Sequence, residues 1–163
     1  MKTKKITLCA ILSAVAIVFG YIEALFPIPV PIPGVKWGLG NIVILIALYI
    51  LDKKYAFFIM LVKVMVTSLL FSSLSVFIYS LFGGIFSLNI MIFLKKLNLH
   101  LINVSIGGGI SHNIGQLVAA GIMMKTVTVF SYLPVLIVSG VISALVTGFC
   151  SKIILKRIEK ITD

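Results

Sequence analysis

Long runs of apolar residues, separated by short basic or polar segments, divide this 163-residue chain. Reading the runs between charges and helix breakers predicts about six helices, at residues 6–26, 37–51, 55–71, 74–94, 101–124 and 130–155. A helix that crosses a bilayer needs about 20 apolar residues, and most of these runs reach that length. The second and third are shorter, so we expect them to be poorly tilted or to be completed by a neighbouring loop.

The composition decides what surrounds these helices. Hydrophobic residues make up 61% of the chain and charged residues only 11%, with a mean hydropathy of +1.24. A soluble globule of this size could not be covered by so few polar groups. The chain is therefore predicted to be an all-α integral membrane protein. We expect a single membrane domain over residues 1–163, passing several times through a bacterial-type plasma membrane.

Basic residues predict the orientation, because loops rich in Lys and Arg stay in the cytoplasm. With the N-terminus inside, eleven basic residues fall at cytoplasmic ends and two, Lys36 and Lys125, fall outside. The eleven are Lys2, Lys4, Lys5, Lys53, Lys54, Lys95, Lys96, Lys152, Lys156, Arg157 and Lys160. An even number of spans then places both termini in the cytoplasm. The net charge of +10 is accounted for by topology and by contact with the lipid bilayer, and no nucleic-acid partner is predicted.

A run of alternating prolines follows the first apolar segment. From Phe26 to Pro33 every residue is a proline or precedes one, which excludes helix and predicts a stiff, extended strip. Its other members, Ile28, Val30 and Ile32, are apolar, so the strip should lie against an apolar surface rather than act as a solvated linker. On the outer side it would be either a lid over a ligand or a seal for the short second helix.

Charged residues inside apolar segments are costly and point to function. Lys63 lies within the third predicted helix, where it could snorkel, pair structurally with Glu23, or contact an anionic substrate. Glu23 lies near the outer end of the first helix. It could simply reach water, orient Lys36 or Lys63, or accept a hydrogen bond from a substrate.

Further polar residues stand at the mouth of the second helix and in the fifth. Lys36 and Trp37 are typical interface anchors, whereas Asn41 lies one turn inside the helix. The fifth helix carries a cluster whose spacings of three and four residues predict one shared side near mid-membrane depth. Its main members are His112, Asn113 and Gln116. They either join helices or line a pocket, and no metal site or cofactor is predicted because no second ligand stands at a suitable spacing from the histidine.

Several spaced motifs resemble those of one family. They are Pro-x-Pro-Gly-x-Lys-x-Gly-Leu-x-Asn at 31–41, Ser-Leu-x-Gly-Gly at 80–84, His-Asn-x-Gly-Gln at 112–116 and Tyr-Leu-Pro at 132–134. They resemble the Gx transporter family, often labelled heptaprenyl diphosphate synthase component I. The chain departs from the family pattern at Gly40, where Ala is usual, and at Lys63, where Arg is usual. The latter keeps the positive charge but not the bidentate geometry.

That family is similar in turn to the substrate-capture S components of energy-coupling factor (ECF) importers. The resemblance implies a six-helix bundle with cytoplasmic termini and a ligand site in its outer half. It also implies an Ala-x-x-x-Ala surface on the first helix that docks onto a transmembrane coupling subunit. Ala10 and Ala14 form such a pair at the cytoplasmic end of the first helix, where small residues let helices approach closely.

Two functions from different classes follow. In the first, the protein binds a small organic micronutrient from outside and releases it inside when coupled to a transmembrane partner and ATPase subunits. The substrate-binding residues would be Glu23, Lys36, Trp37, Asn41, Lys63, His112, Asn113 and Gln116. In the alternative, it is a non-catalytic membrane subunit associated with prenyl diphosphate synthesis. Its four acidic residues are scattered and could not hold magnesium on a diphosphate, so the chain itself is not expected to be an enzyme. A role as an assembly or scaffold protein also stays open.

Overall fold

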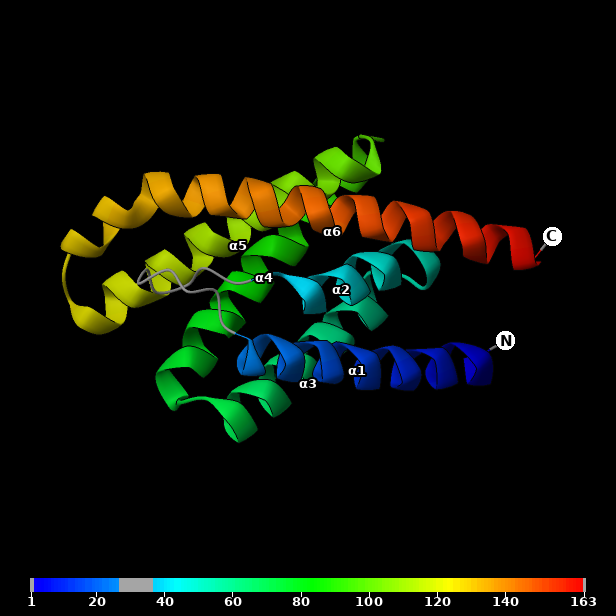
Figure 1. The fold of residues 1–163 in the computed structure, drawn as a ribbon, viewed down its shortest axis with the longest axis horizontal. Helices are drawn as coiled ribbons and strands as arrows, with labels where there is room; N and C mark the ends of the chain where they lie inside the picture. Colours follow the sequence, from blue (N-terminus) through cyan, green and yellow to red (C-terminus); the bar gives the residue numbers. More distant parts are fainter. Residues whose placement is uncertain (1, 27–36, 163) are drawn as a thin grey trace.

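The computed structural model describes residues 2–26 and 37–162, and every element within them is helical. The proline strip and Lys36 lie outside the described residues, so the choice between lid and seal stays a prediction. The six predicted helices are all present (Figure 1). They are α1 (Lys2–Leu25), α2 (Leu39–Ile50), α3 (Lys53–Phe71), α4 (Leu74–Lys96), α5 (Leu101–Met124) and α6 (Leu133–Thr162), with a short 3₁₀ helix, η1 (Thr128–Tyr132), before the last.

Local capping explains where the helices begin. Asp52 adopts an extended conformation, and its carboxylate accepts a hydrogen bond of 2.8 Å from the backbone N–H of Lys54. This cap starts α3 at Lys53, two residues before the predicted position. Ser73 caps α4 in the same way, since its hydroxyl accepts a hydrogen bond of 3.4 Å from the N–H of Val76.

Four segments are long and apolar enough to cross a membrane: Thr3–Leu25, Lys53–Phe71, Leu74–Lys96 and Thr128–Lys160. The protein therefore has the helices of a membrane protein. Helix α2 has only 12 residues, well short of a bilayer core. Helix α5 has 24 residues, but its polar cluster lowers its hydropathy. The count of six spans and the cytoplasmic location of the termini stay predictions.

The two ends of the chain lie at the same end of the bundle (Figure 1). The turn between α2 and α3 and the turn between α4 and α5 lie at that end too. Most of the chain's lysines therefore gather at one end of the molecule. This arrangement is compatible with an even number of crossings, and the side of the membrane that this end faces stays a prediction.

Helix α2 lies at the centre of the bundle. Its residues from Ile42 to Leu48 are all buried, and the helix packs against α1, α3 and α6. Helices α5 and α6 cross closely at Gly109 and Gly140, because a Cβ atom on Gly109 would lie 2.6 Å from the carbonyl oxygen of Gly140. This crossing brings the polar part of α5 next to α6, beside the first turn of α2.

Candidate functional site

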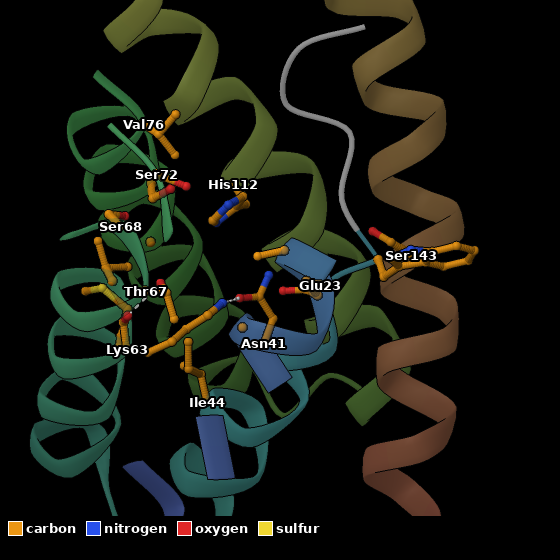
Figure 2. A pocket seen from close by; sticks show the side chains of 18 of the residues that line it. Glu23, Asn41, Ile44, Lys63, Thr67, Ser68, Ser72, Val76, His112 and Ser143 are labelled. Carbon is orange, nitrogen blue, oxygen red and sulfur yellow. Dashed lines mark hydrogen bonds between the residues drawn. The ribbon is translucent and has the colours of Figure 1, made fainter. Parts of the chain in front are cut away.

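A cavity of about 290 Å³ lies in the half of the bundle away from the chain termini. The ends of α1 and α3, the starts of α2 and α4, and the middles of α5 and α6 surround it (Figure 2). Ten of its described lining side chains are charged, amide, imidazole or hydroxyl groups. They are Glu23, Asn41, Lys63, Thr67, Ser68, Ser72, Ser80, His112, Asn113 and Ser143.

Lys63 and Asn41 meet in this cavity. The Nζ atom of Lys63 on α3 donates a hydrogen bond of 3.2 Å to the Oδ1 atom of Asn41 in the first turn of α2 (Figure 2). The lysine side chain lies across Gly40, where a Cβ atom would come within 2.5 Å of Cε and 2.7 Å of Nζ. The missing side chain at Gly40 thus gives the ammonium group room to reach Asn41. A positive charge is held beside the start of α2.

Glu23 fixes the start of the same helix. Its Oε1 atom accepts a hydrogen bond of 2.8 Å from the backbone N–H of Leu39, the first residue of α2. A carboxylate is favourable there because the first N–H groups of a helix have no partner within the helix and carry partial positive charge. Gly38, just before, has a φ of 79°, a left-handed conformation that favours glycine. Glu23 therefore positions the residues that enter the cavity.

The other end of α2 is held by Lys95 at the end of α4. Its Nζ atom donates a hydrogen bond of 2.7 Å to the carbonyl oxygen of Leu48 and lies 4.5 Å from the ring centroid of Tyr49. A cation is favourable at the C-terminal end of a helix for the converse reason. In the sequence, Lys95 was counted only among the basic residues that predict the orientation in the membrane. The structure gives it a second role, as an anchor for the buried helix beneath the cavity.

Two buried residues that line the cavity have hydroxyl groups with no hydrogen bond among the described residues. Ser68 on α3 is 3% exposed and Ser80 on α4 is 8% exposed. Buried polar groups are normally paired, and those that face a cavity can bond a ligand or water inside it. The neighbouring Thr67 differs, since its hydroxyl already donates to the carbonyl oxygen of Lys63 at 2.8 Å. Ser68 and Ser80 can therefore bond a ligand without breaking a contact of the fold.

The polar cluster of α5 divides between the cavity and the helix interface. His112 and Asn113 line the cavity, and the Nδ2 atom of Asn113 also donates a hydrogen bond of 2.6 Å to the carbonyl oxygen of Leu136. Gln116 packs against Gly83 of α4 and is not among the described lining residues. Its Oε1 atom is buried without a hydrogen-bond partner in the described part of the chain. The cluster thus does not act as one surface.

Trp37 lies at the edge of the cavity and is 51% exposed. Its Nε1 atom donates a hydrogen bond of 3.0 Å to the carbonyl oxygen of Phe26, which joins the two residues flanking the segment 27–36. The alanines of α1 lie elsewhere. Ala10 and Ala14 are exposed on the outer face of the helix and do not line the cavity.

A protein-family model matches most of the chain. A model described as heptaprenyl diphosphate synthase component I matches residues 12–154. The chain belongs to the heptaprenyl diphosphate synthase component I family, also known as the Gx transporter family. No curated protein and no solved structure matches it. The resemblance suggested by the spaced motifs is thereby confirmed at the level of the family.

The cavity is also lined by residues that were not predicted as site residues from the sequence. Thr67 follows Lys63 on α3 by four residues and so lies next to it on the helix, and Ser68 and the C-cap residue Ser72 are likewise four residues apart. These two polar pairs in an apolar helix were the available signal. In the described residues no three His, Cys, Asp or Glu side chains are grouped in a way that could hold a metal ion.

Proposed function

We propose that this protein is the membrane-embedded, S-component-like substrate-binding subunit of an ECF-type importer for a small organic micronutrient. It binds its substrate in the cavity from the outer side and releases it inside when coupled to a transmembrane partner and ATPase subunits. One observation carries the proposal. A single cavity inside an apolar helical bundle collects the hydrogen-bonded pair of Lys63 and Asn41 together with the hydroxyl groups of Ser68 and Ser80.

The energetic cost of these groups supports a ligand. A lysine at the centre of a membrane span costs about 2.5–3.5 kcal/mol on insertion scales, and such residues usually mark substrate pathways. Lys63 lies in the middle of the candidate span Lys53–Phe71. A cavity of about 290 Å³ is close to the lower limit of ordinary small-molecule pockets, about 300–1,000 Å³. The site therefore suits a compact molecule.

The charges indicate the kind of substrate. The ammonium of Lys63 and the amide of Asn41 offer hydrogen-bond donors to a ligand, while the first turn of α2 is already capped by the carboxylate of Glu23. A carboxylate or a carbonyl oxygen would satisfy these groups, and the hydroxyls of Ser68 and Ser80 would bond its other polar atoms. The substrate is a small anionic or carbonyl-bearing molecule.

Coupling to a partner fits the outer face of α1. Ala10 and Ala14 are exposed there, so another helix could approach the backbone of α1 closely. The sequence shows no nucleotide-binding motif, so the energy for release would come from other chains. These alanines are the proposed contact with a transmembrane coupling subunit.

A second candidate function follows from the family description, which names a component of a prenyl diphosphate synthase. The protein would then be a non-catalytic membrane subunit of that system. The cavity favours the first proposal. A long prenyl chain placed in it would bury the hydroxyls of Ser68 and Ser80 against hydrocarbon, which costs free energy for each group left unpaired.

Mass spectrometry of small molecules extracted from the detergent-purified protein tests the proposal. We expect a compact acidic or carbonyl-bearing compound from the wild type. It should be depleted in Lys63→Met, which removes the charge, and retained in Lys63→Arg, which keeps it. If no small molecule is retained, and the prenyl transferase activity of a co-purifying enzyme depends on this chain, the subunit function replaces the importer function.

A further inference from the structure

A second hollow, distinct from the polar cavity, lies on the surface between α3 and α4. It has a volume of about 340 Å³. Its walls are mainly apolar, with Phe57 and Phe58 on α3 facing Ile85 and Leu88 on α4. Phe57 is 42% exposed and Phe58 59% exposed, so the groove opens to the surroundings of the bundle. In a membrane protein those surroundings are lipid chains.

The charges of the groove stand at one end only. Lys53 and Lys54, the first residues of α3, line it together with the aromatic pair one turn further along the helix. The nearest acid in sequence, Asp52, has one carboxylate oxygen bound to the backbone N–H of Lys54. Lys95 at the end of α4 is directed to Leu48 of α2 instead. The groove thus combines a doubly cationic end with an apolar length.

We propose that this groove is a binding site for an anionic phospholipid. The phosphate of the headgroup contacts the ammonium groups of Lys53 and Lys54, and one acyl chain lies along Phe57, Phe58 and Ile85. Basic pockets between membrane helices on the cytoplasmic side are typical sites for anionic headgroups. The basic residues of the chain predict that this end faces the cytoplasm, whose leaflet carries anionic lipid.

This site does not depend on the importer function. It lies on the outer surface of the α3–α4 pair, and it shares no described lining residue with the polar cavity. Helix α3 nevertheless links the two, since Lys54 at its start belongs to the groove and Lys63 further along belongs to the cavity. A bound lipid would steady the helix that carries the proposed substrate contact.

Native mass spectrometry of the detergent-purified protein tests the site. The probes are phosphatidylglycerol and phosphatidylcholine with identical acyl chains. We expect phosphatidylglycerol to bind about thirtyfold more tightly, in keeping with two lysines near a lipid headgroup. The double variant Lys53→Gln/Lys54→Gln should bind both lipids equally. The matched control Lys152→Gln/Lys156→Gln removes two exposed charges from α6 and should keep the preference.

A third variant separates the groove from surface charge alone. Asn89 is exposed at the groove, and Asn89→Trp should weaken phosphatidylglycerol binding by covering it while leaving every charge in place. Unchanged binding by Asn89→Trp, or equal loss of preference in both lysine double variants, would overturn the proposal. Displacement of phosphatidylglycerol by a lower concentration of farnesyl diphosphate would also overturn it, and would assign the groove to a prenyl diphosphate.

Discussion

Glu23 and Lys95 bind opposite ends of the same buried helix. The carboxylate of Glu23 accepts from the N–H of Leu39 at 2.8 Å, and the ammonium of Lys95 donates to the carbonyl oxygen of Leu48 at 2.7 Å. Helix α2 has 12 residues, and the first N–H groups and last carbonyl groups of a helix have no partner within the helix. Two charged side chains from α1 and α4 provide partners at the two ends. The proposed substrate contact at Asn41 therefore depends on a helix whose two ends are held by side chains of other helices.

The first prediction concerns Glu23. Replacing it with Ala should destabilise the protein by about 1–2 kcal/mol, because the start of α2 loses its charged cap. Glu23→Gln keeps an acceptor oxygen and should cost less. Thermal unfolding in detergent measures both. Equal melting temperatures for Glu23→Ala and the wild type would show that the carboxylate does not hold the helix.

The second prediction concerns the other end of α2. Lys95→Met keeps the length of the side chain but removes the charge, and should cost about 1–3 kcal/mol for the lost hydrogen bond from a charged donor. Lys96→Met removes a neighbouring exposed charge and serves as the control. The same unfolding measurement applies. If both variants unfold alike, the bond from Lys95 to Leu48 adds nothing to stability.

The third prediction uses the contact between Gly40 and Lys63. A methyl group at Gly40 would meet the end of the lysine side chain, so Gly40→Ala should move the ammonium away from Asn41. Lysine is flexible, and stability should change little. The affinity for the extracted compound should fall about tenfold, as expected for one weakened charged hydrogen bond. An affinity equal to that of the wild type would show that Lys63 need not lie against Asn41 to bind.

The fourth prediction concerns the outer face of α1. Enlarging Ala10 and Ala14 to Trp should prevent another helix from approaching closely, and co-purification with a coupling subunit and an ATPase should be lost. Val15→Trp adds a similar ring at an exposed position about 100° or more around α1 from both alanines and should be tolerated. Pull-down from the native membrane followed by mass spectrometry measures this. Retention of the partners by Ala10→Trp/Ala14→Trp would remove the docking role.

Much of the fold could be predicted from the sequence, because apolar runs and breakers set the helices directly. The predicted start at residue 55 differs from the start of α3 at Lys53 because the Asp52 cap acts two residues earlier. The central position of α2 could not be predicted. A short apolar segment has the same kind of sequence whether it faces lipid or protein. Only the packing of the helices shows that residues 42–48 are buried.

The site was predicted only in part. Lys63 and Asn41 stood out because a charge and an amide are costly in apolar helices, and the structure brings them together. The role of Glu23 as a cap was missed, since its partner is a backbone N–H that no side-chain pattern reveals. Gln116 was grouped with His112 by helical spacing, and both pack against Gly83 of α4, but only His112 is among the described residues that line the cavity. Helical spacing gives a shared side without showing which part of that side faces a cavity.

The central claim is that Lys63 holds a small molecule inside the membrane. Native mass spectra of the wild type, Lys63→Met and the exposed control Lys152→Met, purified side by side, test it most directly. We predict a bound compound of the same mass on the wild type and on Lys152→Met, with occupancy on Lys63→Met lowered about ten- to a hundredfold. Equal occupancy on all three proteins, with Lys63→Met folded, would contradict the claim.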